Sequence, residues 1–198
     1  MNFPFDQDII LENERVILRP INISSDAETL WPINEANPML TQYFPNMISD
    51  RDSFELFFES ALQLKEAKSK YPFIITDKRS TQAAGSTSFM NIDIANERLE
   101  IGSTYLGPQF HQTGLNRNVK LLMLSYAFEL LQVKRVELKT DARNVQSRTA
   151  MEGMGAQYEG SLRSHTIMTD GYRRDTAYYS ILIDEWPQVK AQLLLKIK

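Results

Sequence analysis

The sequence predicts a mixed α/β domain built around one central sheet, and two kinds of apolar pattern lead to this fold class. Alternating apolar residues indicate strands, whereas apolar residues three and four positions apart indicate helices. Together they give the order β, α, α, three β, α, β, α, β, β, a strand meander followed by a β-α-β-α-β run. The chain has 198 residues, 42% of them hydrophobic, enough for one sizeable core. We therefore expect a single domain over residues 1–198.

The first half of the chain is expected to hold one strand, two helices and then the meander. Proline stops the first strand at Pro20, and a polar cluster at 24–26 is typical of a helix start. The sequence over 49–52 resembles a capping box, and the prolines before it mark irregular chain. The expected elements are a strand over 15–20, helices over about 24–35 and 50–70, and strands over 71–76, 83–92 and 98–106.

The second half is expected to alternate helices and strands before closing in a hairpin. Leu115, Val119 and Leu122 repeat at near-helical spacing, and Gly155 is typical of the residue that follows a helix. The dipeptide Asp170-Gly171 strongly favours a hairpin turn. The expected elements are a helix over 114–131, a strand over 133–140, a helix over 144–154, hairpin strands over 157–168 and 172–183, and a short helix or covering tail over 184–198.

The composition excludes several classes of function. A net charge of −3 gives no broad basic field for nucleic acid. No apolar run of 18 residues is present for a membrane span, and the first residues lack the pattern of a signal peptide, so a cytoplasmic location is expected. The absence of cysteine removes thiolate nucleophiles and thiolate metal sites, and two histidines make a histidine-rich metal site improbable. We therefore expect no metal, no membrane and no nucleic acid.

The charge order at the start of the helix over 114–131 is unusual. A helix N-terminus carries partial positive charge, yet Arg117 and Lys120 lie there without an acid nearby. Such a start is explained if an anion binds the free backbone N–H groups where Gly114 lets the chain turn. The alternative is an exposed helix whose charges cost only a few tenths of a kcal/mol, roughly, or a plain capping turn.

This turn also resembles a known motif. From Gln109 to Asn116 it is similar to the acyl-CoA pyrophosphate loop of the GNAT superfamily of N-acetyltransferases, which has the form [Q/R]-x-x-G-x-[G/A]. Gly114 matches the middle glycine, whereas His111 and Asn116 stand at the Gln/Arg and final Gly/Ala positions. The surroundings resemble the RimJ/RimL-type branch over about residues 12–187. They include Arg15-Val-Ile-Leu-Arg-Pro, Lys134-Arg-Val-Glu-Leu-Lys-Thr-Asp-Ala-Arg-Asn-Val-Gln-Ser and Arg174-Asp-Thr-Ala-Tyr-Tyr-Ser.

The resemblance implies a fold and an activity. The fold would be of the GNAT acyl-CoA N-acyltransferase type, with a central, mostly antiparallel sheet splayed after its fourth strand and flanked by helices. The activity would be transfer of an acetyl group from acetyl-CoA, as co-substrate, to a primary amine by direct attack. The acceptor would be a protein N-terminus or a small amine, and a homodimer is compatible with the family. The alternatives are a non-catalytic acyl-CoA-binding sensor module and a nucleotide-phosphate binder.

The resemblance also implies which residues hold acetyl-CoA. The loop N–H groups would bind its pyrophosphate, with Arg117 and Lys120 nearby, and a strand edge would pair with its pantetheine arm. Asn144, an excellent helix N-cap in its own right, would contact the arm as well. The expected cofactor-binding residues are Thr104, Tyr105, Leu106, His111, Gln112, Thr113, Gly114, Leu115, Asn116, Arg117, Asn144 and Ser147.

Three residues are the candidates for proton transfer. Ser147 would protonate the departing thiolate, because the position at which many GNAT enzymes carry a tyrosine acid holds Met151. Glu100 is the first candidate for the general base that an ammonium substrate requires, and His165 is the second. The ordinary alternatives are a surface strand residue for Glu100 and a structural role for His165, and Glu137 and Asp141 are weaker base candidates.

Overall fold

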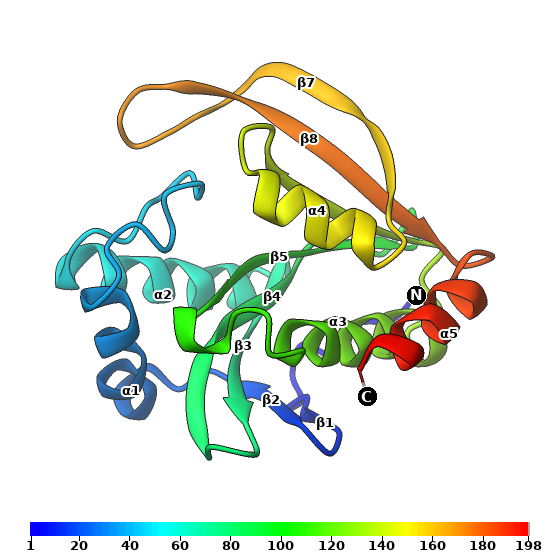
Figure 1. The fold of residues 1–198 in the computed structure, drawn as a ribbon, viewed down its shortest axis with the longest axis horizontal. Coiled ribbons are helices and arrows are strands. Elements are labelled where there is room, and N and C mark those ends of the chain that lie inside the picture. The colour runs from blue at the N-terminus through cyan, green and yellow to red at the C-terminus, as the bar shows by residue number, and fades with distance from the viewer. Residues whose placement is uncertain (198) are drawn as a thin grey trace.

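The computed structural model describes residues 1–197 and confirms the predicted fold class, a mixed sheet with helices on both faces (Figure 1). The described strands form one eight-stranded sheet in the order β1-β2-β3-β4-β5-β6-β8-β7. They are β1 (Leu11–Glu12), β2 (Val16–Pro20), β3 (Lys70–Asp77), β4 (Gln82–Asp93), β5 (Arg98–Leu106), β6 (Arg135–Asp141), β7 (Gln157–Ile167) and β8 (Arg173–Leu182). The α-helices are α1 (Ile23–Glu35), α2 (Arg51–Glu66), α3 (Leu115–Ser125), α4 (Val145–Gly153) and α5 (Trp186–Lys196).

The sheet opens between β5 and β6. Neighbouring strands pair antiparallel except these two, which run parallel over three residue pairs from Arg98–Arg135 to Glu100–Glu137. Beyond Glu100, β5 continues to pair only with β4, and β6 only with β8. The two strands therefore diverge, and the edge of β5 that faces β6 is left without a strand partner in the described residues. Because β1 precedes the first expected strand, β5 is the fourth strand of the prediction, and the expected splay is confirmed.

A β-bulge deforms β5 beside this opening. Ser86 and Ser88 of β4 pair with Tyr105 and Gly102 of β5, so β5 carries one extra residue over this stretch. Ser103 adopts a φ of 48°, the left-handed region that non-glycine residues rarely occupy. Bulges bend a strand and redirect its side chains, and they are frequent next to active sites. The bulge thus changes the direction of β5 just beyond Glu100, the last residue that pairs with β6.

Each face of the sheet has its own core. On one face, α3 and α5 pack on strand residues such as Phe89 and Leu99. On the other face, α1 and α2 bury Leu30, Phe54 and Phe58 against Ile74 and Tyr105. Figure 1 shows α4 near the β7–β8 hairpin, which extends along one side of the molecule. The opening between β5 and β6 consequently lies between two firmly packed layers.

Several element boundaries differ from those predicted, for local reasons. The cap of α1 is Asn22, whose side chain accepts a hydrogen bond from the Ser24 N–H, rather than the 24–26 cluster itself. Helix α2 ends at Glu66 because Lys68 turns to a φ of 57°, which frees Lys70 to begin β3. Helix α3 continues as a π-helical turn over Tyr126–Leu130. Among the described helices, none has the length and apolar character needed to cross a membrane.

Candidate active site

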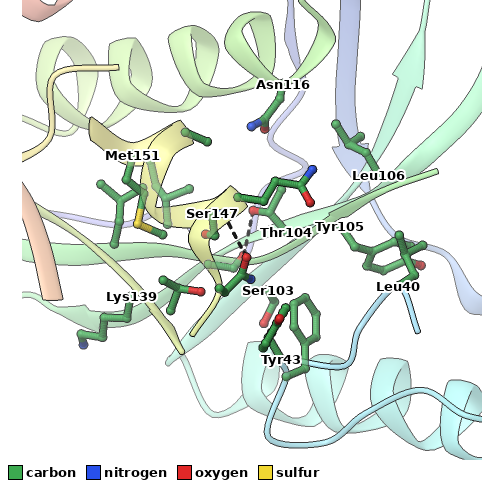
Figure 2. Close-up of a pocket in the computed structure, with 18 of the residues that line it drawn as sticks. Leu40, Tyr43, Ser103, Thr104, Tyr105, Leu106, Asn116, Lys139, Ser147 and Met151 are labelled. Carbon is green, nitrogen blue, oxygen red and sulfur yellow. Dashed lines mark hydrogen bonds between the residues drawn. The ribbon is translucent and has the colours of Figure 1, made fainter. Parts of the chain in front are cut away.

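A cavity of about 1370 Å³ occupies the opening between β5 and β6. Its walls come from the loop over 37–49, from α2, β5, α4 and the β7–β8 hairpin, and from the turn that precedes α3. Figure 2 shows side chains of β5, including Ser103, Thr104 and Tyr105, between Ser147 and Met151 of α4 and Tyr43 of the 37–49 loop. Segments distant in the sequence therefore meet at the splayed edge.

The start of α3 forms one end of the cavity. Gly114 precedes the helix with a φ of 83°, and a Cβ at this residue would meet no atom within 4 Å. The N-cap residue Gly114 has no side chain to cap this helix, and its first turn contains no acid. Within residues 1–197, the one side-chain contact to the first N–H groups is a long one, 3.4 Å from the Leu115 N–H to the Thr113 hydroxyl. Uncapped N–H groups at a helix N-terminus attract anions. The predicted anion-binding geometry is therefore available beside Gly114.

The residues around Gly114 contribute to this end in different ways. The His111 ring turns back so that its Nε2 lies 2.9 Å from the Leu106 carbonyl oxygen, and Gln112 lines the cavity. Thr113 donates its hydroxyl to the Phe110 carbonyl at 2.8 Å. Leu115 is fully buried in the core, whereas Thr113 is exposed, and neither residue belongs to the cavity lining. Asn116 and Arg117 both line the cavity.

Asn116 adds an unsatisfied group to this end. Its Oδ1 atom is buried and has no hydrogen-bond partner in the described part of the chain. Arg117 is exposed and donates to the Lys196 carbonyl oxygen at 3.4 Å, which brings the end of α5 to the same end of the cavity. A buried acceptor without a partner is costly, and a ligand donor would remove that cost.

The β5 residues predicted to face the pantetheine arm point to opposite faces of the sheet. Thr104 bonds to Thr87 across the sheet at 2.7 Å, and Tyr105 is buried on the α1 side, where Asn34 donates to its hydroxyl at 3.2 Å. Burial raises the pKa of Tyr105 to about 12, so its phenol is a poor acid near neutral pH. What Thr104, Tyr105 and Leu106 can offer at the free edge is therefore chiefly backbone.

Lys120 does not join Arg117 near the turn, contrary to expectation. Its side chain is only 5% exposed and donates to the Thr104 hydroxyl at 2.9 Å. None of the ion pairs formed by residues 1–197 includes it, and burial lowers its pKa to about 7. Lys120 lies on the buried face of α3, one turn before Met123 and Leu124, so the helical spacing could have revealed it.

Helix α4 contributes the pair predicted from the sequence. Asn144 caps the helix, since its Oδ1 accepts the Ser147 N–H at 3.0 Å. The Ser147 hydroxyl makes no hydrogen bond with other described residues and lines the cavity. Met151, one turn later, also lines it (Figure 2). The cap predicted for Asn144 is thus confirmed, and Ser147 presents a free hydroxyl to the cavity.

Glu100 lies at the point where β5 and β6 separate. It is 6% exposed, and its carboxylate accepts hydrogen bonds from Lys139 at 2.9 Å and from Asn91 at 2.7 Å. Lys139 also binds Glu137 at 2.9 Å. Burial opposes ionisation of Glu137, but hydrogen bonds from Lys139, Arg135 and Arg98 lower its pKa to about 2. Glu137 is therefore a fixed anion and not a base, which leaves Glu100 as the carboxylate in the cavity wall.

The hairpin and the 37–49 loop close the opposite end. Arg174 of β8 donates to the Tyr43 carbonyl oxygen at 2.9 Å, and Thr169 donates to that of Pro45 at 2.8 Å. His165 of β7 is exposed on the cavity wall, with its Nδ1 3.1 Å from the Thr176 hydroxyl. Asp141, fully buried, pairs with Arg143 and does not line the cavity. His165 thus shares the cavity with Glu100, whereas Asp141 does not.

The charge of the cavity wall differs from that of the whole chain. Among the described residues that line it are six Lys or Arg side chains and one carboxylate, that of Glu100. The cations are Lys70, Arg117, Lys120, Lys139, Arg174 and Lys196. Most of this charge was missed in the sequence, because only the fold brings these residues together. A cavity of this sign attracts anionic ligands.

Comparison with known proteins identifies relatives of this arrangement. Residues 15–157 match the family model described as an acetyltransferase (GNAT) domain. YdaF of Bacillus subtilis (strain 168), for which ribosomal N-acetyltransferase activity has been proposed, is 32% identical over 102 residues. That match covers 52% of this chain and 55% of YdaF, so the chain spans about half the length of this relative.

Two solved structures share the fold. A GCN5-related N-acetyltransferase from Brucella melitensis has a TM-score of 0.88 at 29% identity, covering 97% of this chain and 86% of that one. Mycobacterium smegmatis RimJ in complex with CoA-disulfide has a TM-score of 0.78 at 22% identity, covering 96% and 93%. The similarity to RimJ concerns the fold alone, and the names of YdaF and RimJ agree with the predicted RimJ/RimL-like branch.

Proposed function

Because this chain belongs to the GNAT acetyltransferase family, we propose that it transfers the acetyl group of acetyl-CoA to a primary amine. The observation that carries the proposal is that two stretches of backbone without strand or N-cap partners border one cavity. They are the edge of β5 beyond Glu100, which no strand of residues 1–197 covers on the β6 side, and the N-terminus of α3 at Gly114. Pantetheine amides can pair with a strand edge, and a pyrophosphate suits a helix N-terminus. Acetyl-CoA carries both groups on one molecule.

The residues of the cavity fit this co-substrate. The positive φ of Gly114 and the open space at its Cβ position let an anion approach the backbone closely. The unpartnered Oδ1 of Asn116 could accept a hydrogen bond from the arm. Arg117 and Lys196 supply positive charge at the same end, which suits phosphate groups. Acetyl-CoA, when bound, supplies an activated thioester for acyl transfer.

Glu100 and Ser147 are the proposed proton-transfer residues. Glu100 would take the proton of the acceptor ammonium, directly or through water, because it is the carboxylate of the cavity wall. Ser147 would donate a proton to the departing sulfur, because its hydroxyl faces the cavity and Met151 cannot donate. His165 remains the second candidate base. The acceptor would be a small amine or a protein N-terminus, and the name given to YdaF favours ribosomal proteins among the latter.

Two measurements test the proposal together. Acetyl-CoA at a hundred times its Kd should add about 2.7 kcal/mol of stability and raise Tm by roughly 5–11 °C, whereas ATP should not. Thiol release should then appear with at least one member of a panel of small amines and N-terminal peptides. A larger shift with ATP than with acetyl-CoA would contradict the assignment of the turn. Firm acetyl-CoA binding without thiol release from any acceptor would contradict the activity and indicate a sensor.

A further inference from the structure

We propose that the acceptor amine carries a carboxylate close to the reacting nitrogen, and that Lys70 binds this carboxylate. The inference rests on the proposed acetyltransferase function and names the class of its acceptor. Lys70 begins β3 and reaches across the sheet to the bulged strand, where its Nζ donates to the Ser103 hydroxyl at 3.2 Å. Both residues line the cavity, on the face covered by α2.

Lys70 is a buried cation without a counterion. Its side chain is 6% exposed, and no carboxylate of the described residues lies within ion-pairing distance of it. Burial lowers its pKa to about 8, although the charge of Glu100 opposes this effect. Apart from Ser103, the ammonium has the ring of Phe57 at 5.2 Å. An ammonium kept from water with so few partners gains most from a ligand that brings a negative charge.

The other cations at this end already have partners or structural roles. Lys139 is shared by Glu100 and Glu137, and these carboxylates raise its pKa although burial opposes them. Arg174 donates to the Tyr43 carbonyl and the Thr176 hydroxyl and so attaches the 37–49 loop to the hairpin. Lys70 is the remaining cation that an acceptor could neutralise by direct contact.

The sheet register places Lys70 in line with the proposed base. Lys70 is paired with Met90, and Met90 with Glu100, so the three residues form one row across adjacent strands and share a face. Two strand spacings separate the backbones of Lys70 and Glu100 by about 10 Å. The Lys70 side chain shortens this gap by extending to Ser103 of β5. One acceptor molecule could therefore bring an amine to Glu100 and a carboxylate to Lys70.

This arrangement disfavours a polyamine as acceptor. A polycation would have to bind in a cavity whose described wall contains one carboxylate and six cations. Like charges repel strongly where water is excluded. The preferred chemistry, a primary amine with a nearby carboxylate, occurs in free amino acids and in peptides whose second residue is acidic. The same experiment can separate these two sources.

The experiment compares acceptors that differ only in this charge. Thiol release gives kcat/KM for an amino acid and its amide, and for C-terminally amidated peptides beginning Ser-Asp or Ser-Asn. We expect the wild-type protein to prefer the carboxylate member of at least one pair by roughly 10- to 100-fold. The preference should fall toward one in Lys70→Met, persist in Lys70→Arg, and be unaltered in Lys134→Met, which changes an exposed lysine outside the cavity. Comparing each variant with the wild type cancels differences in amine basicity between acceptors.

The outcomes distinguish this inference from the function on which it rests. Acetyl-CoA titration and thermal unfolding of Lys70→Met first show that the fold and the CoA site are intact. Equal use of charged and uncharged acceptors by the wild type, or an unchanged preference in Lys70→Met, would overturn the assignment. If no acceptor releases thiol, calorimetric titration of the same pairs into CoA-saturated protein decides the matter. Binding of the carboxylate members that depends on Lys70 supports the site, and absence of that binding refutes it.

Discussion

Replacing Lys120 by methionine should stabilise the protein. The ammonium of Lys120 is buried, its one hydrogen bond within the described residues goes to Thr104, and no carboxylate there pairs with it. Methionine has nearly the same length and is suited to a buried, irregular space. The Thr104 hydroxyl would keep its partner Thr87, so the substitution leaves no orphaned group.

The size of the effect follows from the pKa. A fall in the pKa of Lys120 from 10.5 to about 7 corresponds to roughly 5 kcal/mol of penalty on the buried ammonium. The hydrogen bond to Thr104 offsets about 1–2 kcal/mol of this in the wild type, because one partner is charged. We therefore expect Lys120→Met to gain about 3 kcal/mol below pH 7, and its Tm to rise by roughly 6–12 °C.

The pH dependence provides a signature. The native pKa of Lys120 lies below that of the unfolded chain, so between about pH 7 and 10.5 only the unfolded state holds the proton. The stability of the wild-type protein should consequently rise with pH in this window. Lys70, whose pKa is lowered to about 8, adds to this rise from about pH 8 upward. The advantage of Lys120→Met should be largest below pH 7 and shrink as the pH rises.

Urea unfolding followed by circular dichroism measures this directly at about pH 6 and about pH 9.5. Lys134→Met is the matched control, because it removes an exposed lysine and should change stability by less than about 0.5 kcal/mol. A Lys120→Met protein no more stable than the wild type at about pH 6 would refute the reasoning. So would a gain of the same size at both pH values.

Three substitutions test the proposed machinery. Gly114→Asp should abolish acetyl-CoA binding in calorimetry by adding negative charge at the proposed pyrophosphate site. The control Gly171→Asp changes a glycine with a similar positive φ of 80° and equally open space, and it should bind acetyl-CoA normally. Equal affinities of the two variants would exclude the turn at Gly114 as the pyrophosphate site. Ser147→Ala should lower kcat at least about 100-fold with little change in acetyl-CoA affinity; parallel losses would make Ser147 a binding residue. Glu100→Gln should lower kcat at least about 100-fold, and Lys139 would still be paired with Glu137 in this variant. Undiminished thiol release would exclude Glu100 as the base.

The order of the elements could be predicted from the sequence because each depends on local signals. The capping box, the glycine after α4 and the hairpin dipeptide all act within a few residues. The structure has all three, although the capping box predicted over 49–52 is formed one residue later, by Asp50 and Ser53. The boundaries that were missed depend on competing local choices. Asn22 takes the cap of α1, and Lys68 ends α2 so that Lys70 can enter the sheet.

The opening in the sheet could be expected only from the family resemblance. No pattern within β5 or β6 marks the residue at which the two strands part, because each strand keeps a partner on its other side. The bulge at Ser103 is likewise invisible in the sequence, because Leu99, Ile101 and Tyr105 continue one pattern of alternating positions. In the structure Leu99 and Ile101 belong to the core on the α3 side and Tyr105 to the core on the α2 side. Topology, not local propensity, creates the cavity.

The cationic character of the cavity is the strongest case of this kind. The chain as a whole carries −3, and this net charge gave no indication of a cationic cavity, yet the described wall of the cavity holds six cations and one carboxylate. Two of these cations are buried lysines that reach adjacent β5 residues from opposite faces of the sheet. Lys70 donates to Ser103 and Lys120 to Thr104.

Burying two unpaired ammonium groups lowers stability, so their position beside the bulge calls for a functional reason. The two lysines lie on opposite faces of the sheet. Lys120 is on the α3 side, where acetyl-CoA is proposed to bind, and Lys70 is on the α2 side. An anionic co-substrate arriving from one side and a carboxylate-bearing amine from the other would each bring the charge that its side lacks. The cost in the free protein would then be recovered when both ligands are bound.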